Sequence, residues 1–389
     1  MSKVSILIID DEKSVLKALS RVLYPWAKKQ NVELVTHSSP KEALEYIDEG
    51  TAEIGVIISD LMMPEMDGIQ LLNETASRLP ITSSLILTGS SDIEKVTEAI
   101  EAGISSFMLK PWDDDKLLEK VEQALITYRI HRDQNSYVKM INEELQWAGE
   151  LQKTLLKTEE PKSEKVDFEI TYQPLPNLHC GGDYYDIIHF GPEQYIVLLG
   201  DVAGHGVKAA FITSILKTII YRNYIKEKIG SPFSPAAFLS WLNNQVCKEL
   251  EKFPDMIVTF LVIFLDIPNK KIMYSNAGHL PFYIFNGNSP GKWLSDSGPG
   301  MGFKPDLEYK DSETPLRPKA SVVCITDGLV EHPLSDKAVG LEDIEKIIIE
   351  NAAAGNFHEK IIENVKTLLK TDQLYDDTTL ISFKINSLE

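Results

Sequence analysis

Apolar and polar positions divide the chain into two parts with different periodicities. Up to about residue 125, short continuous apolar runs alternate with stretches whose apolar residues recur at helical spacing. The runs are 4–10, 33–38, 54–60, 83–90 and 105–110, and the helical stretches are 12–26, 40–50, 68–79, 92–102 and one from about 113. Continuous apolar strands that alternate with helices indicate a parallel sheet covered on both faces. We predict an α/β domain over residues 1–125, with ligands at the carboxyl ends of its strands.

From about residue 166 the pattern changes, because strand-like runs dominate. These runs include 168–174, 195–201, 256–266, 271–278, 282–286, 320–326 and 378–385, and helical stretches interrupt them at 207–228, 234–252, 341–352 and 357–370. Strands and helices in separate blocks favour an α+β domain, here a sandwich of two sheets flanked by helices. We place this domain at residues 161–389.

A helical linker over residues 126–160 is expected to join the two domains. Within 126–157 there is no strand pattern, and a series of mostly apolar residues steps by three and four, as in a coiled-coil seam. The series is Val138, Ile141, Leu145, Ala148, Gln152 and Leu155. A seam would make the chain a homodimer through this helix. The alternative is an amphipathic helix that lies on one of the domains.

Composition narrows the class of protein. The chain has 389 residues, 43% of them hydrophobic, and a formal net charge of −19. This length favours two domains, and the acidic balance argues against nucleic-acid binding, since phosphate contacts need Lys and Arg. No apolar run reaches the roughly 18 residues of a membrane span, and the N-terminus reads as a strand rather than a signal peptide. The odd set Cys180, Cys247 and Cys324 fits reduced thiols, so we expect a cytoplasmic protein.

Charged residues gather at the strand ends of the first domain. Asp10 and Asp11 end the first strand, Asp60 the third and Thr88 the fourth, and Lys110 ends the fifth. Clustered carboxylates need a cation, and Mg²⁺ is the natural one. A carboxylate beside Mg²⁺ and a Lys is suited to attack phosphorus and hold an acyl phosphate. The alternative is a set of solvated aspartates in a nucleotide-binding sheet, but the chain has no glycine-rich phosphate loop.

The segments IIDDE, SDLMMPEMDG, LTGS and FMLKPW, in this order, resemble the receiver domains of two-component response regulators. The resemblance implies a flavodoxin-like domain with a five-stranded parallel sheet, in which a sensor histidine kinase phosphorylates Asp60. It implies Mg²⁺ bound by Asp11, Asp60 and the Met62 carbonyl, with Asp10 helping through water. It also implies that Thr88, Phe107 and Lys110 are the switch residues.

We expect four aspartates of the second domain to lie each at the end of an apolar, strand-forming run, next to glycine or another aspartate. They are Asp183, Asp201, Asp327 and Asp376. Carboxylates gathered without partner His or Cys are the ligands of hard cations such as Mg²⁺ or Mn²⁺. Two such ions about 3.5–4 Å apart can make a hydroxide and clamp a phosphoryl group. The pattern therefore predicts metal-dependent phosphoryl hydrolysis.

The segments GGDYYD, GDVAGHG, YSNAGHLP, TDGLVE and DDTTL resemble the SpoIIE/RsbU-like branch of the metal-dependent PPM (type 2C) serine/threonine phosphatases. The resemblance implies two Mn²⁺ or Mg²⁺ ions, with Asp183, Asp201 and the Val202 carbonyl as ligands and Asp327 and Asp376 completing the second ion. Asp377 stands where relatives often have Asn, which implies an auxiliary role. His205 and His279 are each either a general acid or, the reading we favour, a structural histidine.

Together the two resemblances imply a response regulator with a phosphatase output that acts on phosphoserine or phosphothreonine. The implied substrate is an anti-sigma factor antagonist, a STAS-domain protein. The rival hypothesis is a catalytically silent adaptor that binds a sigma-factor regulator in a phosphorylation-dependent way. A DNA-binding transcription factor is disfavoured by the acidic charge and by the strand-rich second half.

Overall fold

The structure is a computed structural model that describes residues 3–89, 104–158, 160–175, 178–252, 256–287, 289–330 and 339–388. Within the described ranges, no helix combines the length and the apolar character that a membrane span requires. The chain separates into two compact units, Met1–Ile141 and Asn142–Glu389.

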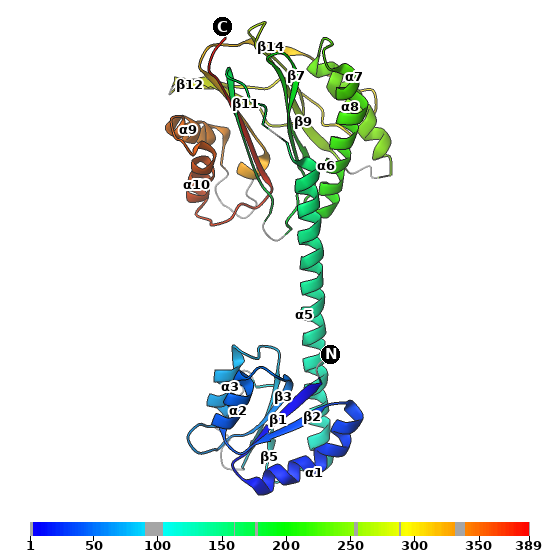
Figure 1. Ribbon diagram of the computed structural model, residues 1–389, viewed down its shortest axis with the longest axis vertical. Helices are drawn as coiled ribbons and strands as arrows, with labels where there is room; N and C mark the ends of the chain where they lie inside the picture. Colours follow the sequence, from blue (N-terminus) through cyan, green and yellow to red (C-terminus); the bar gives the residue numbers. More distant parts are fainter. Residues whose placement is uncertain are drawn as a thin grey trace. The chain divides into compact units, whose positions relative to one another are not determined.

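The first unit is built on a parallel five-stranded sheet in the order β2-β1-β3-β4-β5 (Figure 1). The strands are β1 (Val4–Ile9), β2 (Glu33–His37), β3 (Glu53–Asp60), β4 (Ser83–Thr88) and β5 (Ser106–Leu109). The helices are α1 (Lys13–Gln30), α2 (Pro40–Asp48), α3 (Gly68–Ala76) and the first part of α5 (Asp114–Leu156). The flavodoxin-like α/β prediction is confirmed; the helix expected at 92–102 lies outside the described residues.

Both faces of this sheet are buried, as continuous apolar strands require. One core joins β1, β3 and β4 to α1 and α5, and includes Ile6, Leu19 and Leu117. A second core on the opposite face joins β1 and β3 to α2 and α3 through Leu7 and Leu71. Because the five strands are parallel, their carboxyl ends lie at one edge of the sheet, and the residues that follow the strands gather at that edge.

The second unit is a sandwich of two sheets (Figure 1). Sheet I has the order β13-β10-β9-β8-β7 with β14 paired to β10, and sheet II has the order β12-β11-β15-β16-β6. Sheet I consists of β7 (Asp183–Gly191), β8 (Gln194–Val202), β9 (Val258–Asp266), β10 (Lys271–Ala277), β13 (Ser297–Gly298) and β14 (Ser312–Pro315). Sheet II consists of β6 (Val166–Gln173), β11 (Phe282–Asn286), β12 (Ser289–Leu294), β15 (Ala320–Ile325) and β16 (Thr378–Ile385).

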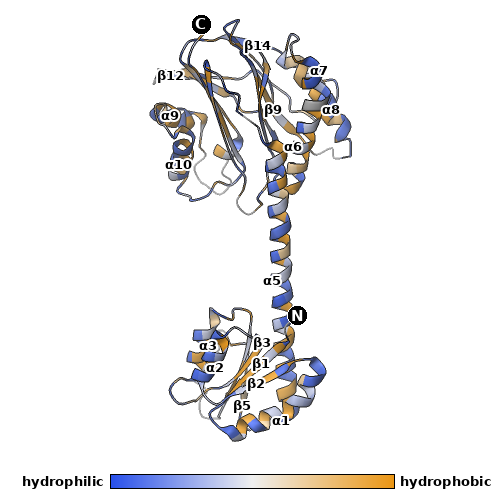
Figure 2. Cartoon of the chain, viewed as in Figure 1, coloured by the Kyte–Doolittle hydropathy of each residue, from blue (hydrophilic) through white to orange (hydrophobic). Residues whose placement is uncertain are grey.

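Helices cover the outer face of each sheet. Sheet I carries α6 (Val207–Ile220), which continues through a π-helical turn (Tyr221–Ile225) into α7 (Lys226–Lys228), and α8 (Pro235–Glu249); sheet II carries α9 (Leu341–Asn351) and α10 (Phe357–Leu369). Apolar residues of both sheets meet in the middle layer, including Val197, Ile263 and Phe383 (Figure 2). The sequence prediction of a two-sheet sandwich flanked by helices is confirmed.

Helix α5 runs without interruption through the predicted linker. Its first turns bury Leu117 and Val121 in the first unit, and its last turns bury Gln152 and Leu156 in the second. The single coiled-coil seam predicted from sequence is wrong in one respect, since Gln152 faces the helix's own domain. Three members of the predicted series, Val138, Ile141 and Leu155, are exposed. Other apolar side chains of α5 are exposed as well, namely Ile126, Ile130, Tyr137, Met140, Trp147 and Leu151.

Candidate functional sites

The carboxyl edge of the first sheet brings two acids and a lysine into contact. Lys110 Nζ lies 2.8 Å from Asp10 Oδ2 and 2.8 Å from Asp60 Oδ1. Asp10 is fully buried, and its Oδ1 accepts a hydrogen bond from the Glu12 backbone N–H. Carboxylate oxygens of Asp10, Asp11 and Asp60 all lie within 4.8 Å of one another, close enough to share one cation. Three acids and one lysine form the arrangement that the sequence predicted for Mg²⁺ and an acyl phosphate.

Burial and charge act in opposite directions on this cluster. Burial raises the pKa of Asp60, and its hydrogen bond and ion pair with Lys110 offset only part of that rise. For Lys110, burial alone would lower the pKa, but the bonds to Asp10 and Asp60 raise it above its usual value. A buried carboxylate with an uncompensated desolvation cost is one that a divalent cation stabilises.

The other residues assigned to the first site lie around this cluster. Thr88 is buried at the end of β4, and its hydroxyl donates to the Gly89 carbonyl over 3.2 Å. Phe107 on β5 is 37% exposed, and the Met62 side chain is half exposed in the loop after Asp60. Thr88 and Phe107, two of the predicted switch residues, therefore lie on β4 and β5, the two strands on one side of β3.

In the second unit, Asp183 begins β7, which corrects the prediction that it ends a strand, and it stands directly opposite Asp201 on β8. Asp183 is buried, and its Oδ2 accepts hydrogen bonds from Thr326 Oγ1 at 2.9 Å and Thr379 Oγ1 at 2.6 Å. Burial and then the charge of Asp201 raise the pKa of Asp183 well above its usual value. The two negative charges repel each other, and a cation bound by both carboxylates would offset that repulsion.

Asp327 and Asp376 belong to the neighbouring ends of β15 and β16. Asp327 begins a single 3₁₀ turn that Thr326 separates from β15, and Asp376 lies two residues before β16. Thr326 and Thr379 tie the two strand ends together, because the Thr379 N–H donates to Thr326 Oγ1 over 2.8 Å. Sheet I therefore supplies Asp183 and Asp201, and sheet II supplies Asp327 and Asp376, so the predicted ligands come from both layers of the sandwich.

Asp377 holds a backbone segment. Its Oδ1 accepts from the Leu175 N–H at 2.9 Å and its Oδ2 from the Gly182 N–H at 2.7 Å. Burial raises the pKa of Asp377 to about 6, although both N–H bonds act to lower it. Since each oxygen is already bonded to the backbone, the geometry favours the auxiliary role that the sequence suggested over direct metal ligation.

Glycines next to the aspartates allow neighbouring backbone carbonyl groups to come close to the site. A Cβ on Gly182 would meet the Val202 carbonyl oxygen at 2.6 Å and the Gly204 carbonyl oxygen at 3.0 Å. An all-oxygen donor set of carboxylates and a carbonyl suits Mg²⁺ or Mn²⁺. In the described chain, however, only Asp10, Asp11 and Asp60 bring three donor atoms within 4.8 Å of one another. The donor atoms of the second unit are of the kind that a pair of Mg²⁺ or Mn²⁺ ions needs, but among the described residues its carboxylate oxygens do not form such a group.

The histidines of the glycine-flanked loops have different surroundings. His279 is buried. Its backbone N–H donates to Asn276 Oδ1 at 2.8 Å, and its ring Nδ1 lies 3.1 Å from the Leu280 carbonyl oxygen. Burial lowers the pKa of His279 to about 4, so its ring is neutral at pH 7. This environment favours the structural reading for His279. His205 is exposed, and its charge acts to lower the pKa of Asp377.

The sequence did not assign a role at the second site to three residues that the structure places beside it. Thr326 and Thr379 bond to Asp183, and their signal was their position within the TDG and DDTT segments. Gln152 of α5 donates through Nε2 to the Gly181 carbonyl at 2.7 Å and accepts from the Gly181 N–H at 3.1 Å. In the sequence, Gln152 stands out as the polar residue of an otherwise apolar series, which indicates that its side chain has a polar partner.

Comparisons with known proteins agree with both halves of the chain. The family model described as Stage II sporulation protein E (SpoIIE) matches residues 191–386, and the response regulator receiver domain model matches residues 6–122. The chain is 26% identical over 272 residues to the phosphoserine phosphatase RsbU of Bacillus subtilis, covering 69% of this chain and 77% of that protein. It is 36% identical over 123 residues to the transcriptional regulatory protein ZraR of Salmonella typhimurium, covering 32% of this chain and 26% of that protein.

Among solved structures, the SiaA-PP2C domain of Pseudomonas aeruginosa superposes with a TM-score of 0.52 at 19% identity, covering 64% of this chain and 98% of that one. At this identity the similarity concerns the fold. It agrees with the two-sheet architecture of the second unit.

Proposed function

Since this chain belongs to the SpoIIE family of PPM-type phosphatases and carries an N-terminal receiver domain, we propose that it is a response regulator whose serine/threonine phosphatase activity is set by phosphorylation of Asp60. The observation that carries the proposal is the presence of two separate acidic sites in one chain. One is the Asp10, Asp60 and Lys110 cluster, and the other is centred on Asp183 and Asp201.

The phosphatase family is metal-dependent, and two Mg²⁺ or Mn²⁺ ions would supply an activated water and a clamp on the phosphoryl group. Asp183, Asp201, Asp327 and Asp376 would hold the ions, together with the Val202 carbonyl. The hydroxyls that bond to Asp183 Oδ2 orient that carboxylate and oppose the rise in its pKa. Asp377 would position Gly182, and with it the start of β7, through the backbone.

In the first unit, Mg²⁺ would be held by Asp11, Asp60 and the Met62 carbonyl and would neutralise the incoming phosphoryl group. Lys110 already contacts Asp60 and can pair with a phosphoryl oxygen once Asp60 is modified. The partner that delivers this group is a sensor histidine kinase. Thr88 and Phe107 would respond to it as switch residues.

Helix α5 is the proposed route between the two sites. Its early turns pack in the first unit, while Gln152 near its end bonds to both backbone groups of Gly181. Gly181 is followed by Gly182, which Asp377 holds, and by the ligand candidate Asp183. A shift of α5 would therefore reach the metal ligands through two residues of backbone. We propose that phosphorylation activates the enzyme.

A homodimer through α5 is supported by apolar surface that the described chain leaves exposed. Trp147 and Leu151 on α5 are 64% and 41% exposed, and Phe211 and Ile215 on α6 are 63% and 39% exposed. Gln152 bonds to Thr213, so these two helices are neighbours. A second copy of the same surface would cover both helices at once.

The proposed substrate is the phosphorylated form of an anti-sigma factor antagonist of the STAS type, in a partner-switching pathway. Support comes from the similarity to RsbU, a phosphoserine phosphatase. The test is release of phosphate from phosphorylated STAS proteins in the presence of Mn²⁺. We expect turnover that is abolished by Asp201→Asn and by Asp327→Asn, with the receiver still able to accept phosphate. Tight binding of the antagonist without turnover of any phosphopeptide would favour the adaptor.

A further inference from the structure

Strand β7 forms an open edge of sheet I. Within the described chain it pairs with β8 alone. The Val202 N–H donates to the Gly182 carbonyl, and the register between the strands is regular as far as His189. In an antiparallel ladder bonded residues alternate, so Ile187 and His189 direct their backbone N–H and C=O groups away from β8. No described group forms a backbone bond with these outward-facing positions.

A groove of about 660 Å³ lies along this edge. Ile187 and Ile188 both line it, although consecutive strand residues point to opposite faces of a sheet. The groove therefore follows the edge of β7 rather than either face. Its other wall is formed by residues 160–162 and by the turn around α7, where Ile229 is 57% exposed.

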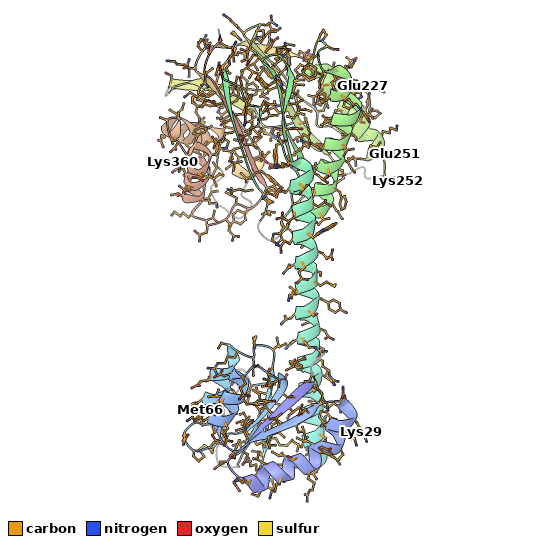
Figure 3. The ribbon with its side chains drawn as sticks, viewed as in Figure 1. Lys29, Met66, Glu227, Glu251, Lys252 and Lys360 are labelled. Atoms are coloured by element: carbon orange, nitrogen blue, oxygen red, sulfur yellow. The ribbon has the colours of Figure 1, made fainter. Side chains whose placement is uncertain are left out.

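The groove carries positive charge on a chain whose net charge is −19. Lys162 and Lys226 line it, both are exposed, and neither has an ion-pair partner among the described residues. The carboxylate of Glu160, the acid in the lining, already accepts a hydrogen bond from the Ile170 N–H at 3.2 Å. Glu227, the neighbour of Lys226, projects from α7 at the surface (Figure 3) and is absent from the groove lining.

We propose that this groove binds an extended, acidic peptide segment of a partner protein, which adds as a strand to the open edge of β7. Ile187 and His189 provide donors and acceptors for a strand's main chain, which is the source of affinity in strand addition. Apolar side chains of the peptide would pack on Ile229, which is 57% exposed, while Ile187 contributes its backbone. Acidic side chains of the peptide would pair with Lys162 and Lys226. The same two lysines would repel a basic peptide, so the groove selects an acidic one.

The experiment measures fluorescence anisotropy of a labelled octapeptide in which Val and Glu alternate, titrated with the full chain. We expect saturable binding that weakens at least about tenfold in the double variant Lys162→Glu, Lys226→Glu. Lys228→Glu is the matched control, because Lys228 lies on the same helix and outside the groove, and it should bind as the unmodified chain does. Hydrolysis of a small phosphate ester by the double variant should be unchanged, which shows that it is folded.

Two further peptides separate strand addition from other modes of binding. A peptide with Lys in place of Glu should not bind. The acidic peptide N-methylated at alternate residues should lose binding, since it retains its charges but not its main-chain donors. Equal binding of the N-methylated peptide, equal binding by the double variant, or no binding of the acidic peptide would overturn the proposal. None of these outcomes depends on the phosphatase reaction.

Discussion

Replacing Gln152 by Leu tests how α5 communicates with the phosphatase site. Gln152 is 3% exposed and forms three hydrogen bonds, two with the backbone of Gly181 and one with Thr213 Oγ1. Leu is one bond shorter than Gln and has no polar atoms. Gln152→Leu therefore removes the polar link to the segment that precedes Asp183 and retains apolar contact in the same place.

The free-energy cost of Gln152→Leu follows from the two backbone groups that lose their hydrogen-bond partner. The Gly181 N–H and C=O are both buried, and a buried polar group without a partner costs about 1–3 kcal/mol. If these bonds hold in one state of the switch and not in the other, they set a coupling free energy of the same size. That energy corresponds to a change of about 5- to 150-fold in activity between phosphorylated and unphosphorylated chain.

The assay compares phosphate release from a phosphoserine peptide with and without a small phosphodonor at saturating Mn²⁺. We expect Gln152→Leu to lose most of the response to phosphorylation while the receiver is phosphorylated normally. Gln146→Leu is the control, because Gln146 lies on the same helix with an exposed side chain. A full response in Gln152→Leu would refute the role of this contact.

Three further outcomes follow from the structure. Thr379→Val removes the 2.6 Å bond to the buried Asp183 carboxylate and should raise the Mn²⁺ concentration for half-maximal activity about tenfold or more, measured by metal titration. Burial lowers the pKa of His358 from 6.5 to about 4, so the unfolded chain takes up a proton at a higher pH than the folded chain. The stability contributed by this group is present above pH 6.5 and is lost as the pH falls towards 4, by about 3 kcal/mol, and His358→Gln should flatten that part of the denaturation profile. Trp147→Glu with Leu151→Glu should shift the sedimentation of a dimer to that of a monomer.

The strand-end aspartates could be predicted from the sequence because apolar runs fix where strands end. Asp60 is the last residue of β3, which is buried along nearly its whole length, and Asp201 is the second-to-last residue of β8. The residue at the end of such a run lies at the edge of its sheet whatever the rest of the fold does. The two sites could therefore be located from local pattern and motif.

The contacts that complete the second site could not be predicted in the same way. Asp183 bonds to Thr326 and Thr379, which are 143 and 196 residues away along the chain. These contacts depend on how the two sheets stack, and periodicity within one strand carries no information about stacking. The spacing of Gln152 predicts a position in a coiled-coil series, but the backbone of Gly181 gives it a hydrogen-bond partner within its own domain.

The most direct test of the account is the effect of Asp60 phosphorylation on phosphatase turnover. Phosphate release from a phosphoserine peptide is measured with Mn²⁺ before and after treatment with a small phosphodonor, for the unmodified chain and for Asp60→Asn. We expect turnover to rise on treatment of the unmodified chain and to stay constant in Asp60→Asn. Equal turnover of the phosphorylated and unphosphorylated chain would contradict the account.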